Sequence, residues 1–471
     1  MSPYLFSQTI GITDFMRLNP YVNLNNPAYF VPYNGYVGIP GISNINFNFY
    51  NSSFRYKNLF KLDYYGKPTT FTPNKFVNSL HPEKNWFNIE TNFELLGFGF
   101  RVDKYFFSVS YRLRFEESFR YSRDLFGFFV QGNLAKNEKG EYLFTKESPA
   151  VLELAPNINI YQEIALGFQG QITDKLYIGA RPKILFGIIN LQTKKFHAKL
   201  FSNPDDYTIY ANYDVDMRFA SAVPFYKKDA QGNISLNTGS IGSVSGLLNN
   251  IFSNNLGFAI DLGAVYRINQ QIRVSAAVTD LGFIRWKGSP LRMTANPLAD
   301  GKEYFEFSGF TTDQVLDFLR DGVSFFNLDT ILNTVENSFA LDEIKAYNTM
   351  LTSKVMVDGY FDLTPSNRFI LQFKGYILGK AFIPQFTVAY NGTFFNAIDV
   401  VVSYSMMRKS FSNVGLGLGF RMGPVHLYTG TDNVLAAINI LNTSKANFTF
   451  GLLIDFPFKA KVKEPELTTK L

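Results

Sequence analysis

Long stretches of this sequence alternate between apolar and polar residues, and this period of two constrains the fold more than any other feature. In one such stretch, Phe258, Ile260 and Leu262 alternate with Ala259 and Asp261. Successive side chains of a β-strand point to opposite faces, so each stretch predicts a strand with one apolar and one polar face. In each of these stretches, charged residues occur only at the positions that alternate with the apolar ones.

The length of these stretches favours a membrane barrel over a soluble β-sandwich, whose strands also alternate. Several apolar phases run for nine to eleven residues, which is the length that a tilted strand needs to cross a bilayer. Sandwich strands are usually shorter. No stretch approaches the 18 consecutive apolar residues of a membrane-spanning helix, and only helices and closed barrels satisfy their backbone groups in lipid. The 50 Phe, 27 Tyr and absent Cys fit a barrel that crosses an oxidising periplasm unfolded.

The connections between strands alternate between short and long, as in outer-membrane barrels with short periplasmic turns and long extracellular loops. The long ones cover residues 57–83, 118–153, 191–253 and 286–345. The sequence therefore predicts an all-β fold, a 14-stranded antiparallel transmembrane β-barrel over residues 42–458. The expected strands are 42–56, 84–101, 104–117, 154–172, 175–190, 254–268, 271–285, 346–363, 367–378, 381–393, 397–409, 412–422, 424–434 and 446–458.

Three positions predict irregular pairing within these strands. The apolar phase slips by one residue between Leu95 and Leu96, which indicates a β-bulge. Pro182 and Pro384 each remove a hydrogen-bond donor from a wall strand and are expected to weaken pairing.

The two ends of the chain differ from the barrel. We interpret residues 1–8 as the remnant of a signal peptide, with the mature chain beginning near Gln8 or Thr9; the alternative is a plain disordered terminus. Residues 9–41 are rich in Pro, Gly and Asn, which excludes regular elements, but also in aromatic residues, which predicts packing. We expect this segment to form an N-terminal hatch in the barrel lumen. The polar residues 459–471 predict a periplasmic tail.

Charged residues occupy the inward phase of several expected strands, which predicts a polar and obstructed lumen rather than an open pore. Buried charges persist only when they are paired or hydrated, so we expect these groups to form a network; the alternative is that each is simply solvated. The predicted network contains Glu90, Glu94, Arg112, Arg114, Glu116, Glu163, Arg181 and Lys183.

The hatch, the strand count and two long loops together resemble the FadL family of hydrophobic-compound transporters. Asn26, Pro27 and Ala28 match the hatch motif of that family, and the stretches 261–269 and 278–286 are similar to a strand-turn-strand unit of FadL-like barrels. Residues 17–28 and 430–433 look more closely like an uncharacterised family of FadL-related barrels. The resemblance covers essentially the whole chain.

The extracellular loops are expected to be partly helical. Residues 311–321 predict a helix capped by Thr312 or Asp313, and weaker helical candidates lie near 329–339 and 244–252. In FadL transporters such loop helices capture the ligand, and a lid over the barrel mouth is the alternative. The apolar face that could contact a ligand or a partner contains Val315, Leu316, Phe318 and Leu319.

No pattern in the sequence indicates catalysis, a metal site or a cofactor. His81, His197 and His426 have no spacing typical of metal ligands and no local catalytic partner. Lys and Arg are spread evenly despite a net charge of +6, which argues against nucleic-acid binding. We therefore expect a non-enzymatic integral protein of a Gram-negative-type outer membrane, with both termini periplasmic and lipid around its wall.

Two functions remain open at this point. The resemblance implies passive transport of small hydrophobic molecules, captured by loops and released through a hatch-gated lateral route. A charged lumen suits a hydrophobic ligand poorly, because such ligands need mostly apolar pockets. The large loops and the tail favour the alternative, a non-transporting accessory or scaffold subunit that binds other outer-membrane proteins in an assembly or secretion complex.

Overall fold

A computed structural model of the protein describes most of the chain. The described residues are 11–65, 67–82, 84–205, 208–228, 230, 234–236, 252–295, 305–307, 339–378, 381–407, 410–438 and 443–456.

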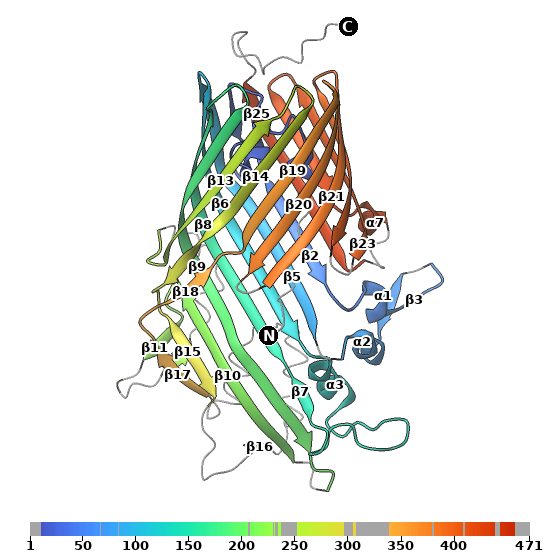
Figure 1. Ribbon diagram of the computed structural model, residues 1–471. Helices are drawn as coiled ribbons and strands as arrows, with labels where there is room; N and C mark the ends of the chain where they lie inside the picture. Colours follow the sequence, from blue (N-terminus) through green and yellow to red (C-terminus); the bar gives the residue numbers. More distant parts are fainter. Residues whose placement is uncertain are drawn as a thin grey trace.

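The chain forms a closed antiparallel barrel of 14 wall strands, as the sequence predicts (Figure 1). The first wall strand is split into β1 (Gly35–Gly38) and β2 (Ile45–Asn51), and both parts pair with the second wall strand and with the last. This pairing closes the ring. The other wall strands are β5 (Asn85–Val102), β6 (Tyr105–Tyr121), β8 (Leu154–Gln171), β9 (Leu176–Ser202), β13 (Leu256–Arg267), β14 (Ile272–Trp286), β19 (Ser353–Thr364), β20 (Asn367–Leu378), β21 (Ala381–Phe394), β22 (Ile398–Met407), β23 (Ser410–Met422), β24 (Val425–Thr431) and β25 (Lys445–Phe456).

The outer face of the wall is apolar and the inner face is polar. On β20 and β21, Leu371, Phe386 and Val388 are 64%, 51% and 46% exposed, whereas the side chains of Gln372 and Thr387 are buried inside the barrel. A broad apolar surface of this kind is stable only in contact with lipid, so the barrel is a membrane-spanning one. No helix among the described residues is long and apolar enough to cross a membrane.

The two ends of the barrel differ as predicted. At one end the strands are joined by short turns, such as residues 103–104 between β5 and β6 and residues 268–271 between β13 and β14. At the other end, long segments extend beyond the wall (Figure 1). The first two of these segments contain the short helices α1 (Tyr56–Leu59), α2 (Pro73–Ser79) and α3 (Arg123–Gln131).

The third long connection begins later than predicted, because β9 does not end at residue 190. It continues to Ser202 and pairs with β10 (Ile209–Ser221), which in turn pairs with β15 (Leu291–Ala295) and β16 (Phe305–Phe307). β17 (Phe339–Glu343) adds to β15. The third and fourth connections therefore extend the sheet of the wall beyond the barrel. The predicted helices at 244–252, 311–321 and 329–339 lie outside the described residues, except for Phe252 and Phe339.

The irregular positions behave in part as predicted. The pairing of β5 with β6 shifts between Glu94 and Leu96, which confirms the bulge. Pro182 keeps its register with β13, but no pairing joins it to β8 between Ala165 and Phe168. Pro384 keeps its register with β20, where it pairs with Gly375. Pro182 thus interrupts one of its two ladders, as predicted.

Residues 11–34, called the N-terminal segment below, pack against the inward face of the wall (Figure 1). The segment contains two short 3-10 helices, η1 (Ile12–Phe15) and η2 (Pro20–Leu24). Its buried side chains share a core with inward-facing apolar residues of the wall, namely Tyr360, Ile370, Ala389, Val401, Tyr428 and Leu453. The expected boundary of the hatch at residue 41 is wrong, since Gly35–Gly38 already belong to the wall. The proposed signal-peptide remnant and the tail lie outside the described residues.

A charge placed on the outer face of the wall tests this orientation. We expect Val388→Arg to lower the free energy of unfolding by about 2–4 kcal/mol, because Val388 lies near the middle of β21 and faces lipid. Val388→Leu should be nearly neutral. The measurement is denaturant unfolding in lipid vesicles, and equal stability of the two variants would contradict a lipid-facing position.

Candidate functional site

Oppositely charged side chains from facing strands meet in the middle of the lumen. Asp280 lies at the centre of this cluster, with its carboxylate 3.0 Å from Arg114 and 2.6 Å from Lys183. Glu163 contacts Arg112 and lies 3.1 Å from Arg114 and 3.8 Å from Lys183. All five side chains are almost completely buried. The cluster therefore joins β6, β8, β9 and β14 through ion pairs that exclude most water.

Other charges extend the cluster on both sides. Glu116 lies 3.0 Å from Arg114, and Glu90 lies 4.0 Å from the same guanidinium and 3.9 Å from Lys354. On the other side, Asp261 is 2.7 Å from Lys183 and 3.6 Å from Arg181. Of the eight residues that the sequence suggested as a network, the structure brings together all except Glu94.

Sequence reasoning missed three members of the cluster: Asp261, Asp280 and Lys354. Asp261 and Lys354 belong to the inward phase of their strands, so the alternation alone could have found them. Asp280 is different, because the pairing of β13 with β14 shifts there and its φ is 58°. This shift turns an outward position inward. The signal in the sequence is the change of apolar phase from Val278 to Leu281.

A small cavity lies between this cluster and the N-terminal segment. Its lining includes Asp14, Asn25, Asn46, Asp280 and Lys374. Most of the lining residues are polar or charged, so the cavity suits water or a polar group better than a hydrocarbon. Among the described residues, no group of three or more His, Cys, Asp or Glu side chains could hold a metal ion.

The N-terminal segment is anchored to the wall by a few polar contacts. Asp432 accepts hydrogen bonds from the backbone N–H groups of Gly11 and Ile12 at 3.0 and 2.8 Å, and Lys374 lies 2.9 Å from Asp14. Burial raises the pKa of Asp432 to about 6, although the two N–H groups oppose this shift. Burial also raises the pKa of Asp14, against the attraction of Lys374. The segment is thus held by contacts that carry a desolvation cost.

The motif formed by Asn26, Pro27 and Ala28 sits on bare backbone of the wall. The side-chain oxygen of Asn26 accepts a hydrogen bond from the N–H of Ala28 at 2.9 Å and so fixes a tight turn. A Cβ at Gly179 would lie 2.2 Å from the carbonyl of Pro27, and one at Gly263 would lie 2.1 Å from the side-chain oxygen of Asn26. Two glycines of β9 and β13 therefore form the notch that receives the motif.

The first wall strand is broken beside the N-terminal segment. Gly38 pairs with Leu453 and Ile45 pairs with Phe450, so residues 39–44 lie opposite only Gly451 and Leu452. The surplus residues loop out of the ladder. Ile42 is 39% exposed on the outer surface, whereas Ser43 is completely buried on the inner side.

Glu94 connects this wall break to the N-terminal segment. Its carboxylate accepts hydrogen bonds from the hydroxyl of Tyr21 and, at 2.8 Å, from that of Ser43. The backbone carbonyl of Ser43 accepts a hydrogen bond from the hydroxyl of Tyr428 at 3.0 Å. A Cβ at Gly97 would lie 2.1 Å from the carboxylate of Glu94, so this glycine makes room for the contact. Glu94 thus belongs to the wall break and not to the central cluster.

The remaining predicted site residues, Val315, Leu316, Phe318 and Leu319, lie outside the described residues. Among the described residues, a buried apolar cluster joins the first two long connections. There Phe76, Val77 and Leu80 of the first connection pack with Tyr121 and Phe126 next to the mouth of the barrel.

Removing the charge of Asp280 tests the central cluster. Asp280→Asn should lower the free energy of unfolding by roughly 3 kcal/mol, because it leaves Arg114 and Lys183 buried with less negative charge. Asparagine tolerates a positive φ, so the backbone should persist. Asp214→Asn is the matched control: it breaks an exposed ion pair with Lys195 and should change little. Equal effects of the two substitutions on urea unfolding would contradict the network.

The fold has counterparts of low sequence identity among solved structures. A FadL homologue from Pseudomonas aeruginosa shares 9% identity at a TM-score of 0.43, over 93% of this chain and 94% of that chain. The toluene transporter TbuX from Ralstonia pickettii shares 9% sequence identity at a TM-score of 0.41, over 93% of this chain and 94% of that chain. The toluene transporter TodX from P. putida shares 8% sequence identity at a TM-score of 0.41, over 97% of this chain and 96% of that chain. No curated protein matches the sequence. The family model described as "Family of unknown function (DUF5723)" matches residues 27–432, and the chain belongs to that family.

Proposed function

We propose that the protein is a passive route for small hydrophobic molecules across the outer membrane of a Gram-negative-type bacterium. The molecules leave the barrel sideways, through the wall break at residues 39–44, and the N-terminal segment gates this exit. Both termini lie on the periplasmic side in this proposal. The observation that carries it is the contact of one carboxylate, Glu94, with both the segment and the break.

A lateral exit fits the interior better than a passage along the axis. The N-terminal segment fills the short-turn end of the barrel, and the cavity above it is lined by charged and amide side chains. A hydrocarbon that crossed this region would displace water from polar groups without replacing their hydrogen bonds. The loop of residues 39–44, in contrast, reaches the apolar outer face, where Ile42 is exposed toward lipid. Loop capture by Val315, Leu316, Phe318 and Leu319 would supply the entrance.

The gate would be local. Tyr21 and Ser43 bind the same carboxylate oxygen of Glu94, so one rotation of the Glu94 side chain would release both contacts. The rings of Tyr36 and Tyr428 lie 5.4 and 6.2 Å from the ring of Tyr21. These aromatic contacts would hold the segment in place while the break opens.

The plug role of the N-terminal segment is tested by conductance in planar bilayers. The intact protein should show no large and stable channel. Deletion of residues 11–34, which leaves β1 in place, should produce one, because the segment shares a core with the wall and contacts its polar inner face. A large channel in the intact protein that is unchanged by the deletion would contradict a plugged lumen.

Repair of the broken strand tests the lateral exit. Deleting residues 40–43 leaves Ile39 and Asn44 opposite Leu452 and Gly451, which restores one-to-one pairing with β25. The alternation of inward and outward side chains is also kept. We expect the repaired barrel to fold and to lose uptake of labelled toluene and 1-octanol into cells.

Glu94→Ala should have the opposite effect on uptake in the same experiment. It removes the shared contact of Tyr21 and Ser43, so uptake should rise severalfold while the wall stays intact. Heat-modifiable mobility on gels checks that both variants are folded. If the repaired barrel takes up both probes as fast as the unaltered protein, the exit does not lie at this break.

An accessory role is the second candidate, and the sheet beyond the barrel favours it. β10, β15, β16 and β17 continue the wall on the long-loop side and offer a broad surface to another outer-membrane protein (Figure 1). Gentle extraction in a mild detergent separates the two candidates. Stoichiometric co-purification with outer-membrane proteins, without an uptake defect on deletion of the gene, would support the accessory role.

A further inference from the structure

The first long connection builds a small unit on the long-loop side of the wall. It leaves β2 after Asn51 and returns to the wall at Asn85. After α1 the chain forms a hairpin, in which β3 (Phe60–Leu62) pairs with β4 (Pro68–Phe71), and then enters α2. Residues 54–80 are called the hairpin unit below. Figure 1 shows α1 and β3 standing out sideways from the wall, so the hairpin lies beside the barrel and not over its mouth.

The hairpin unit begins close to the edge of the lipid-facing band. Phe47 is 39% exposed on the outer face of β2, and the strand ends four residues later at Asn51. At about 3.3 Å per residue, the end of β2 lies within ~13 Å of that lipid contact. On the neighbouring strand β25, which begins at Lys445, Phe448 is 48% exposed. The wall therefore ends here near the membrane surface, and a unit that stands out sideways from it lies above lipid.

Aromatic packing holds the base of the hairpin unit in place. Phe76 of α2 contacts Phe54 and Phe126 edge to face, with ring centroids 5.2 and 5.1 Å apart. Phe126 belongs to α3 and contacts Tyr121 at the end of β6 in the same way, at 5.4 Å. Phe76 and Val77 are buried in this cluster. The base is thus a packed core attached to the wall, and the outer part of the unit faces its surroundings.

Two tyrosines occupy the tip of the hairpin. Tyr64 and Tyr65 are 96% and 82% exposed, and their rings meet edge to face with centroids 5.3 Å apart. Asp63 shapes the tip, because its carboxylate accepts hydrogen bonds from the N–H groups of Tyr65 and Lys67 at 2.9 and 2.7 Å. Tyrosine is enriched where a membrane meets water, since its ring suits the apolar side and its hydroxyl the headgroups. The tip therefore has the composition of a membrane-interface anchor.

Positive charge surrounds these tyrosines. Residues 55–75 have a net charge of +4, with one acidic residue, Asp63, and five basic ones, Arg55, Lys57, Lys61, Lys67 and Lys75. All of the basic residues except Lys57 are exposed. Within the part of the chain that the structure describes, none of the five forms an ion pair, and Lys75 donates a hydrogen bond only to the backbone carbonyl of Lys57. This uncompensated charge favours contact with an anionic surface.

We propose that the hairpin unit docks on the lipid surface beside the barrel and binds the phosphate groups of anionic lipid headgroups in the leaflet on the long-loop side. The two tyrosines enter the headgroup layer, and the basic side chains around them pair with phosphate oxygens. Charge complementarity favours this occupant over an apolar protein surface, which would desolvate the same charges without pairing them. The proposal concerns how the barrel is held in the membrane, so it does not depend on the transport proposed above.

Fluorescence quenching in lipid nanodiscs tests the docking, because the chain contains no cysteine of its own. Thr70→Cys places one label on the hairpin opposite Lys61 and keeps both tyrosines. Lys139→Cys places the same label on an exposed turn of the second connection, as the control position. In discs that contain one third phosphatidylglycerol, lipids with a nitroxide on the headgroup should quench the hairpin label at least threefold more than the control label. In discs of phosphatidylcholine alone, this difference should shrink at least twofold.

Removal of charge separates headgroup binding from mere proximity to the membrane. Lys61→Gln combined with Lys67→Gln should lower the quenching of the hairpin label about twofold in the anionic discs. High salt should have the same effect on the unaltered charges, because it screens exposed ones. The matched control combines Lys199→Gln with Lys227→Gln, two exposed lysines of other connections, and should leave the quenching nearly unchanged. Heat-modifiable mobility on gels checks that all variants are folded.

Three results would overturn the proposal. The first is equal quenching of the hairpin label and the control label in anionic discs. The second is equal quenching of the hairpin label in anionic and neutral discs, which would exclude recognition of the headgroup charge. The third is shielding of the hairpin label only when another outer-membrane protein co-purifies, which would assign this surface to a protein partner.

Discussion

Every peptide group of a strand in lipid must find its hydrogen-bond partner within the protein, because the bilayer offers none. The rest of the structure depends on this requirement. The wall meets it only when the first and last strands join, and here the first strand does so in two parts that both pair with β25. Between them the backbone finds other partners: the N–H of Gly41 bonds to the carbonyl of Glu94, and the N–H of Leu452 to that of Ile42. The wall can therefore be broken without leaving its ladder unsatisfied.

A closed ring also fixes the volume of its interior, and the chain fills it in two ways. Near the short turns, apolar wall residues such as Ile370 and Val401 pack against Ile12 and Met16 of the N-terminal segment. Halfway along, Asp280 and Glu163 neutralise Arg112, Arg114 and Lys183, which come from two strands. The first region is a hydrophobic core and the second an ionic one. Small spaces remain on either side of the segment, and charged side chains take part in the lining of both.

The sequence predicted the wall well because a period of two has a direct physical cause in lipid. The positions of the strands agree within a few residues, except where another rule applies. The sequence did not reveal β1, because Pro40 and Gly41 interrupt the alternation of apolar and polar residues. It also did not reveal the end of β9, because Thr193, Lys194 and Lys195 lie beyond the membrane, where both faces of the strand are polar.

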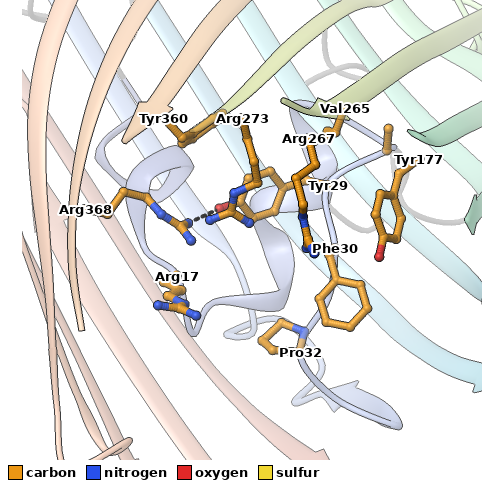
Figure 2. Close-up of a pocket in the computed structure, with 11 residues that line it drawn as sticks. Arg17, Tyr29, Phe30, Pro32, Tyr177, Val265, Arg267, Arg273, Tyr360 and Arg368 are labelled. Atoms are coloured by element: carbon orange, nitrogen blue, oxygen red, sulfur yellow. Dashed lines mark hydrogen bonds between the residues drawn. The ribbon is translucent and has the colours of Figure 1, made fainter. Parts of the chain in front are cut away.

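The sites were less accessible to sequence reasoning, because side chains meet across the lumen through registers that no local pattern encodes. The contact of Asp280 with Arg114 spans 166 positions, and that of Glu94 with Tyr21 spans 73. Arg17, Arg267, Arg273 and Arg368, which come together at the short-turn end (Figure 2), belong to four separate segments. Alternation showed which residues face inward. It could not show which of them meet.

The apolar residues inside the short-turn end make the N-terminal segment part of the hydrophobic core of the barrel and not a separate plug. Ile370, Ala389, Val401 and Leu453 face the axis, and without the segment they would face water. An empty barrel would expose this apolar lining to water, a cost that the segment removes. Movement of the segment would thus be confined to shifts of a few side chains and their immediate backbone, and the interior would stay dry at its apolar end throughout.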